Sequence, residues 1–103
     1  MSSKLRFILT WNIRPGLEAE YSAFINDRLA PGLVELGLPP RDVYYATYGR
    51  VPQILVVLDV PTLPALQQAL QSSQWQAIKK ELLTFIEDYQ EKVIQVDDDS
   101  SYF

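Results

Sequence analysis

The chain has 103 residues, a formal net charge of −4, and neither histidine nor cysteine. These absences exclude disulfide bonds, catalytic triads built on histidine or cysteine, and metal sites that need imidazole or thiolate ligands. With 48% hydrophobic and 21% charged residues, the composition is that of a globular protein. We expect one domain over residues 1–96 and an acidic tail over residues 97–103.

The charges argue against nucleic-acid and membrane partners. Residues 1–50 hold six cations and five anions, whereas residues 51–103 hold three cations and eight anions. Only Lys79 and Lys80 are adjacent cations, and Glu81 follows them, so no basic cluster suits a phosphate backbone. No apolar run approaches the roughly 18 residues of a membrane span. The short apolar run near the N-terminus does not predict a signal peptide, and we expect a soluble cytoplasmic protein.

The first third of the chain predicts a strand followed by a helix. Residues 5–13 alternate between apolar and polar positions, which is typical of a strand with one face on a core. After a turn at Pro15, apolar residues recur at three- and four-residue steps and predict a helix over residues 17–30. We expect Pro31 to interrupt this helix and a short second piece to end at Gly37, a residue that suits the left-handed conformation.

Residues 43–48 and 54–60 are rich in β-forming residues and predict a hairpin. The second strand is apolar on both faces until Asp59, so we expect it in the sheet interior. Thr62 predicts the N-cap of a short helix with Pro64 in its first turn.

A second long helix is predicted over residues 74–90. Ser73 and Gln76 have the spacing of a capping box, in which each side chain bonds the backbone N–H of the other residue. Residues 93–96 predict a last short strand. Three successive aspartates then begin the predicted tail, and because carboxylates on an extended chain point to alternating sides, we expect no metal site there.

The order βαββαβ predicts an α+β, ferredoxin-like fold. Right-handed crossovers place both helical regions on one face of a four-stranded antiparallel sheet. The other face is then left uncovered. Because an exposed apolar sheet face is a liability for a small monomer, we expect this face to form a homodimer interface. Its candidate residues are Ile8, Thr10, Leu55, Val57 and Asp59.

The chain resembles the dimeric α/β-barrel superfamily. The resemblance rests on the order of elements, the Arg14-Pro15-Gly16 turn, the split second helical region, and Ser73-Gln74-Trp75 at the start of the longer helix. The last feature is similar to the antibiotic-biosynthesis-monooxygenase-like and NIPSNAP-like branches. The resemblance implies two ferredoxin-like subunits packed sheet to sheet. It does not imply one activity, since the superfamily includes cofactor-free monooxygenases, heme-degrading enzymes and members of no assigned function.

No cofactor is expected. The heme-degrading relatives use an Asn, a Trp and a His, and this chain has no His. Asn12 also has the opposite strand parity to Trp11, so the two side chains point to opposite faces. No catalytic residue is identified from the sequence.

Two function classes remain open. In the first, the protein binds a small apolar or aromatic molecule without catalysis; in the second, it is a cofactor-independent monooxygenase acting on an aromatic or polyketide-type substrate. The candidate residues for a pocket between sheet and helices are Trp11, Tyr45, Tyr48 and Trp75, which as aromatics equally suit a core. Asp59 is either a buried general base with a raised pKa, or it lies at the strand end, solvated or paired with an Arg across the dimer axis.

Overall fold

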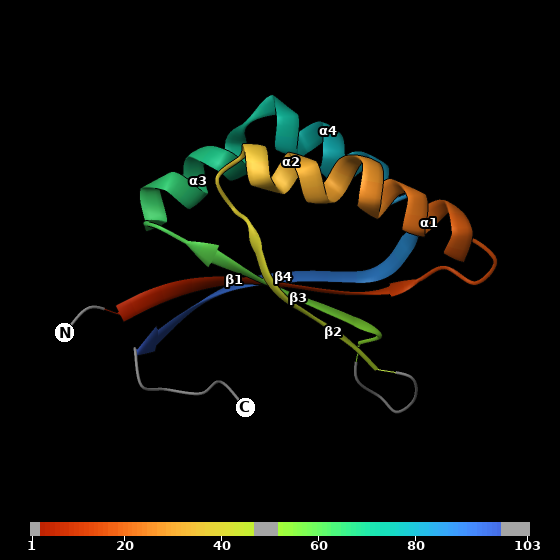
Figure 1. The fold of residues 1–103 in the computed structure, drawn as a ribbon, viewed down its shortest axis with the longest axis horizontal. Coiled ribbons are helices and arrows are strands. Elements are labelled where there is room, and N and C mark those ends of the chain that lie inside the picture. The colour runs from red at the N-terminus through yellow and green to blue at the C-terminus, as the bar shows by residue number, and fades with distance from the viewer. Residues whose placement is uncertain (1–2, 47–51, 98–103) are drawn as a thin grey trace.

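The computed structural model describes residues 3–46 and 52–97. Four strands form one antiparallel sheet in the order β2-β3-β1-β4, and every helix lies on the same face of it (Figure 1). This arrangement confirms the α+β, ferredoxin-like prediction. In chain order the elements are β1 (Ser3–Ile13), α1 (Glu18–Phe24), the π-helix η1 (Ile25–Leu29), α2 (Ala30–Glu35), β2 (Pro40–Tyr45), β3 (Ile54–Val60), α3 (Leu63–Gln71), α4 (Ser73–Leu82) and β4 (Ile86–Asp97).

The two apolar strands predicted from the sequence occupy the middle of the sheet. β1 and β3 pair along their length, with Arg6 opposite Asp59 and Ile8 opposite Val57. Of the side chains of β1 that face the helices, Phe7, Leu9 and Trp11 are at most 1% exposed, as their alternation predicts. The core contains Phe7, Leu9, Trp11, Tyr21, Phe24, Leu29, Leu33, Leu38, Ile54, Val56, Leu58, Val60, Leu66, Ala69, Trp75, Ile78, Leu82 and Ile86.

Pro31 does not interrupt the first helical region, contrary to the sequence-based expectation. A π-turn over η1 directly precedes it, and the Ala30 N–H donates to the Ile25 carbonyl five residues back. This wider turn leaves Pro31 in the first turn of α2, where its missing N–H costs little. Gly37 has a positive φ of 78° just after α2, and the Leu38 N–H donates to the Leu33 carbonyl, which confirms the predicted helix end.

Thr62 caps α3 as predicted: its hydroxyl accepts a hydrogen bond from the Ala65 N–H at 3.2 Å. The cap of α4 is Ser72, so the capping box predicted on Ser73 is wrong. The Ser72 hydroxyl accepts from the Trp75 N–H at 3.1 Å, and the Gln76 side chain donates to the Leu70 carbonyl at 2.8 Å instead of closing a box. Either serine satisfies the preference for a hydroxyl at the N-cap, and the chain uses the first.

The prediction of a helix over residues 74–90 is wrong in its second half. α4 ends at Leu82, and β4 begins at Ile86, well before the predicted strand. The pairing of β4 with β1 shifts register between Thr10 and Asn12, which leaves a bulge in β4. Asp88 in this bulge has a left-handed backbone with φ 58°. The Asn12 amide donates to the Asp88 carboxylate at 3.0 Å, which holds this conformation. Pairing with β1 therefore overrides the helical spacing.

Two further boundaries differ from the expectation. β2 begins at Pro40 rather than at residue 43, and its pairing with β3 shifts register between Pro40 and Asp42, which leaves Arg41 as the extra residue of a bulge. β4 reaches Asp97, the first residue of the predicted tail, and the rest of that tail lies outside the described residues. Within the described part of the chain, no helix is both long and apolar enough to cross a membrane.

The two neighbouring serines before α4 provide a test of the cap. We expect Ser72→Ala to lower the free energy of unfolding by about 1 kcal/mol, because the Trp75 N–H loses its acceptor. Ser73→Ala is the matched control and should stay within about 0.5 kcal/mol of the native protein. Urea unfolding followed by tryptophan fluorescence measures both, and equal effects would contradict the assignment of Ser72 as the cap.

Candidate functional site

The interior between sheet and helices is filled where a pocket was expected. Trp11 points from β1 toward the helices and is 0% exposed. Its indole N–H donates to the Tyr21 hydroxyl of α1 at 2.9 Å, and the two rings meet edge to face with centroids 6.5 Å apart. On its other side Trp11 stacks on Tyr89 of β4, at 6.2 Å and 14° between planes. The indole is therefore held by the fold itself.

Of the four predicted pocket residues, Trp11 and Trp75 lie in the core and Tyr45 lies on the surface. Trp75 is 2% exposed and belongs to the same core as Trp11, and neither residue lines any of the three grooves formed by the described residues. Tyr45 lies on the edge strand β2 with 73% of its surface exposed. Tyr48 lies outside the described residues.

Tyr21 and Tyr89, the two tyrosines that contact Trp11, have raised pKa values and keep their phenol protons at neutral pH. Burial raises the pKa of the Tyr21 phenol to about 12, although the hydrogen bond from Trp11 opposes the shift. Burial also raises the pKa of Tyr89, and Glu91, which accepts its phenol hydrogen bond at 2.6 Å, raises it further. Lys79 lies 5.1 Å from the Tyr89 ring centroid and 3.7 Å from the Glu91 carboxylate. Tyr89, Lys79 and Glu91 thus contact one another beside the core.

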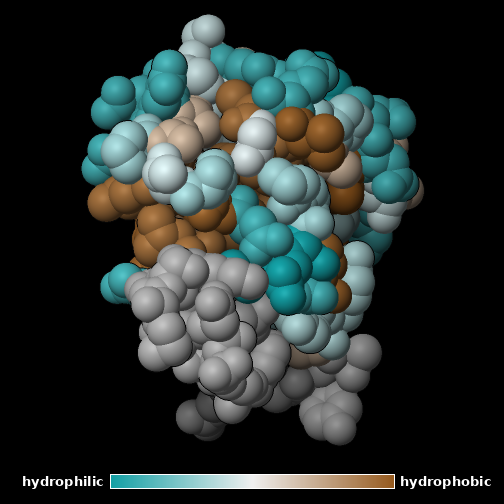
Figure 2. Space-filling view, turned by 60° about the vertical axis from the view of Figure 1, so that its left-hand side comes forward, coloured by the Kyte–Doolittle hydropathy of each residue, from teal (hydrophilic) through white to brown (hydrophobic). Residues whose placement is uncertain are grey.

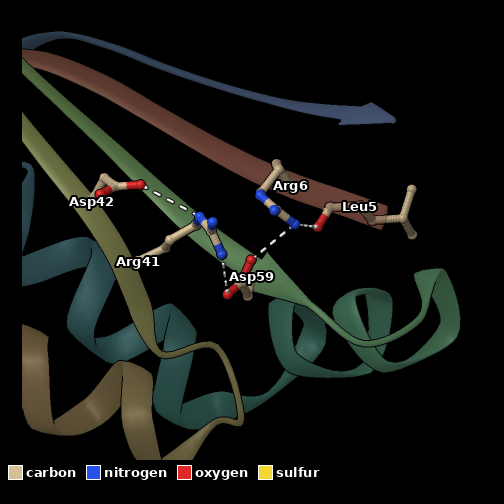
Figure 3. Close-up of polar contacts among 5 residues, drawn as sticks. All are labelled: Leu5, Arg6, Arg41, Asp42 and Asp59. Atoms are coloured by element: carbon tan, nitrogen blue, oxygen red, sulfur yellow. Dashed lines mark hydrogen bonds and ion pairs between the residues drawn. The ribbon is translucent and has the colours of Figure 1, made fainter. Parts of the chain in front are cut away.

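The strongest concentration of charge lies at the other end of the sheet, where Arg6 of β1 faces Asp59 of β3. Arg6 Nη1 lies 2.9 Å from the Asp59 Oδ1 in an ion pair, and it also donates to the Leu5 carbonyl at 3.4 Å. Arg41 donates to the second Asp59 oxygen at 3.4 Å and lies 3.5 Å from Asp42 (Figure 3). Three strands thus contribute to one ionic cluster.

Asp59 is partly exposed near the end of β3, which agrees with the solvated alternative and not with a buried general base, and its pairing across a dimer axis stays a prediction. Its side chain is 44% exposed, so it is not a buried carboxylate, and its ion pairs are with Arg6 and Arg41 of the same chain. The reason is the sheet register: Arg6 stands directly opposite Asp59 in the β1–β3 pair, and opposite charges in that position attract. The bulge in β2 then brings Arg41 to the same carboxylate.

An open groove of about 410 Å³ runs beside this cluster. Its walls combine the three charged residues with apolar ones, and the space-filling view toward this end of the molecule shows hydrophobic and hydrophilic residues side by side (Figure 2). Sequence reasoning did not single out Arg41 or the prolines of this groove. A usable signal was the Pro39–Pro40 pair at the start of β2, because a missing N–H in an edge strand favours a bulge. The lining residues are Arg6, Gly37, Pro39, Arg41, Asp59, Val60 and Pro61.

The face of the sheet without helices is less exposed than its apolar residues suggest. Val57 is 0% and Ile8 8% exposed within the single chain, whereas Thr10 and Leu55 are half-buried. A second groove, of about 280 Å³, lies on this face and includes Ile8 and Thr10 together with residues of β4. The described residues contain no group of three acidic side chains placed to hold a metal ion.

No family model matches the chain, and no curated protein matches it in sequence. Solved structures match it in fold. An uncharacterized NIPSNAP domain protein from Burkholderia xenovorans has a TM-score of 0.71 at 13% identity, covering 94% of this chain and 98% of that chain. A NIPSNAP family protein from Agrobacterium tumefaciens gives 0.70 at 18% identity, covering 95% and 89%.

An ethyl tert-butyl ether D family protein from Bacillus halodurans gives a TM-score of 0.68 at 14% identity, covering 88% of this chain and 96% of that chain. These identities are low, so the likeness concerns the fold. At that level the chain shares the ferredoxin-like fold of the two NIPSNAP proteins.

The Trp11–Tyr21 contact generates a pH prediction. Because the pKa of Tyr21 is raised from 10 to about 12 on folding, stability is fully present below pH 10 and decreases as pH rises from 10 toward 12. We expect Tyr21→Phe to lower the free energy of unfolding by about 1–3 kcal/mol at pH 7, because the buried indole N–H loses its acceptor.

Between pH 9 and pH 11, the free energy of unfolding should fall less in Tyr21→Phe than in the native protein. The variant lacks the phenol whose pKa rises from 10 to about 12 on folding. Tyr89 ionises in both proteins and therefore cancels in the comparison. Urea unfolding at the two pH values measures the difference. Equal losses in both proteins would show that Tyr21 does not titrate as described.

Proposed function

We propose that this protein is a homodimer that binds a small apolar or aromatic molecule without catalysing a reaction, and that the ligand lies in the groove beside Arg6, Arg41 and Asp59. The observation that carries the proposal is the filled interior around Trp11 and Trp75. A ligand between sheet and helices would have to displace core side chains, whereas the groove is open without rearrangement.

The composition of the groove supports a small molecule with an apolar body. Gly37, Pro39, Val60 and Pro61 provide a wall with few hydrogen-bond donors, and prolines and glycine lose little side-chain entropy when a ligand covers them. A few charged groups beside such a wall are typical of sites that orient one ligand. Its volume of about 410 Å³ falls in the range of small-molecule sites, roughly 300–1,000 Å³.

The uncovered sheet face supports the dimer. No helix packs on it (Figure 1). Its apolar residues Ile8, Leu55 and Val57 lie at neighbouring positions of the paired strands β1 and β3. The burial of Ile8 and Val57 in the single chain makes the free apolar area smaller than expected. The interface we propose therefore centres on the half-buried Thr10 and Leu55 and on Tyr44, which is 39% exposed.

The alternative, a cofactor-independent monooxygenase, has less support from the geometry. Such an enzyme needs to enclose an electron-rich substrate and to stabilise its anion away from water. Among the described residues, the tyrosines nearest the core have raised pKa values, and the charged groups meet in an open groove. Oxygen uptake with a hydroxylated anthrone distinguishes the two functions, and we expect no acceleration over buffer.

The dimer is tested by its mass. We expect light scattering at micromolar concentration to give twice the 11.8 kDa of one chain. Thr10→Arg should shift the protein to the monomer mass, because two like charges would meet across the interface. Gln67→Arg, which adds the same charge on the exposed surface of α3, is the matched control and should leave the dimer intact. A monomer mass for the native protein would overturn the proposed assembly.

The ligand site is tested by titrating isotope-labelled protein with a panel of water-soluble aromatic compounds, neutral and anionic. We expect saturable changes in the backbone amide signals of Gly37 and Val60, which line the groove. The indole N–H signals of Trp11 and Trp75 should not move, because both side chains are closed off in the core. Movement of the indole signals first would place the ligand between sheet and helices, and no binding by any compound would end the small-molecule proposal.

A further inference from the structure

We infer that the outer edge of β2 pairs with the same edge of a second copy of this chain, as two antiparallel strands related by a two-fold axis at Tyr44. This contact goes beyond the proposed function, because it uses the edge of the sheet and not the helix-free face. The sheets of the two copies then continue into each other through β2.

β2 is an open edge of the sheet (Figure 1). The strand order β2-β3-β1-β4 gives it one neighbour, β3. Val43 and Tyr45 stand opposite the core residues Val56 and Ile54, yet they are 43% and 73% exposed. The helices therefore leave this part of the edge uncovered. An edge strand with exposed β-branched and aromatic side chains is a template for a further strand.

The hydrogen-bond pattern of β2 directs two residues toward this edge. The Ala46 N–H donates to the Gln53 carbonyl at 2.9 Å, which makes these two a hydrogen-bonded pair of the β2–β3 ladder. In an antiparallel ladder such pairs alternate with pairs whose backbone groups point away from the neighbouring strand. Tyr44 therefore bonds to β3, whereas Val43 and Tyr45 point their N–H and C=O groups outward.

The outward groups complement those of a second copy when Tyr44 stands opposite the partner's Tyr44. Val43 then stands opposite the partner's Tyr45, and each such pair exchanges two backbone hydrogen bonds, so every outward group is satisfied. The side chains meet as aromatic with aromatic and as aromatic with β-branched, which are favourable cross-strand pairs. None of these residues is charged, so no like charges meet directly although each copy has a net charge of −4.

A register centred on Val43 suits the strand less well. It would place Arg41 opposite the partner's Tyr45, and Arg41 is the bulged residue at which the regular pairing of β2 is already broken. Pro40 and this bulge block the first part of the edge, because neither offers a regular ladder to a new strand. Pairing is thus limited to the uncharged second part of β2.

The other edge of the sheet, β4, is protected against such pairing. It carries the charged residues Glu87, Asp88, Glu91 and Lys92, and Asp88 lies in a bulge with a positive φ. Charges and bulges are the usual means by which natural edge strands avoid pairing. Because β4 does not add a strand, the contact at β2 closes as a two-fold pair and does not continue into a fibre.

The contact is tested in Thr10→Arg, in which the proposed dimer through the helix-free face is expected to be absent. A short strand pair is smaller than a standard interface and therefore weak, so we expect the mass to rise from one chain at about 10 μM toward two chains at about 1 mM. Sedimentation equilibrium measures this rise. In a mixture of isotope-labelled and unlabelled chains, a filtered NOE should connect the Tyr44 Hα atoms of two copies, because non-hydrogen-bonded pairs lie closest.

Val43→Pro and Val43→Thr form a matched pair of variants. Proline removes an outward N–H that β3 does not use, so the edge strand tolerates it while each contact loses two hydrogen bonds. Threonine keeps the N–H and the β-branched shape. We expect Val43→Pro to weaken the association at least about tenfold and Val43→Thr to change it less than about threefold. Tyr45→Lys blocks the edge by charge and serves if Val43→Pro does not fold.

Three outcomes would overturn the inference. The first is a mass that stays constant up to about 1 mM in Thr10→Arg, which would leave the dimer through the helix-free face standing. The second is an association that neither Val43→Pro nor Tyr45→Lys weakens, since the contact would then lie elsewhere. The third is an NOE between β2 of one copy and β4 of another, which would show open-ended pairing.

Discussion

The contact of Trp11 with Tyr21 and Tyr89 joins the sheet to the first helix and to the edge strand, and it fills the space in which a pocket was expected. The indole contacts one ring on each side and has its only polar atom satisfied by the Tyr21 hydroxyl. A side chain of that size without a void leaves no room for a ligand above the centre of the sheet. The groove beside Arg6 and Asp59 lies at the rim of the sheet, and a second groove lies on the helix-free face.

The strands in the middle of the sheet are the part of the fold that the sequence predicts best. The alternation in β1 and the two-sided apolar run in β3 are clear sequence signals, because buried faces of a strand favour apolar side chains. The two wrong predictions about the helices, at Pro31 and at Ile86, have a common cause. Local rules place a helix break at the first and a continued helix at the second, whereas tertiary pairing and the π-turn provide other partners for the backbone.

The candidate site was harder to predict, for a reason that concerns register. The alternation of β1 and β3 places Arg6 and Asp59 on one face, but only the pairing of the two strands shows that they are directly opposite. A shift of one residue would have separated them. Arg41 depends on a bulge next to Pro40, which no periodicity reveals. The aromatic candidates were conspicuous in the sequence because they are large, and their size is also what makes them core residues.

The Arg6–Asp59 pair has a structural role that is independent of any ligand. Arg6 is buried while Asp59 is half exposed, and such a pair adds little net stability because desolvation of the guanidinium offsets much of the attraction. It does oppose a register slip, since a shift by one residue would turn Arg6 toward the apolar core. Register alone requires only Nη1 and the carboxylate, however, and does not explain a buried Nε without a partner.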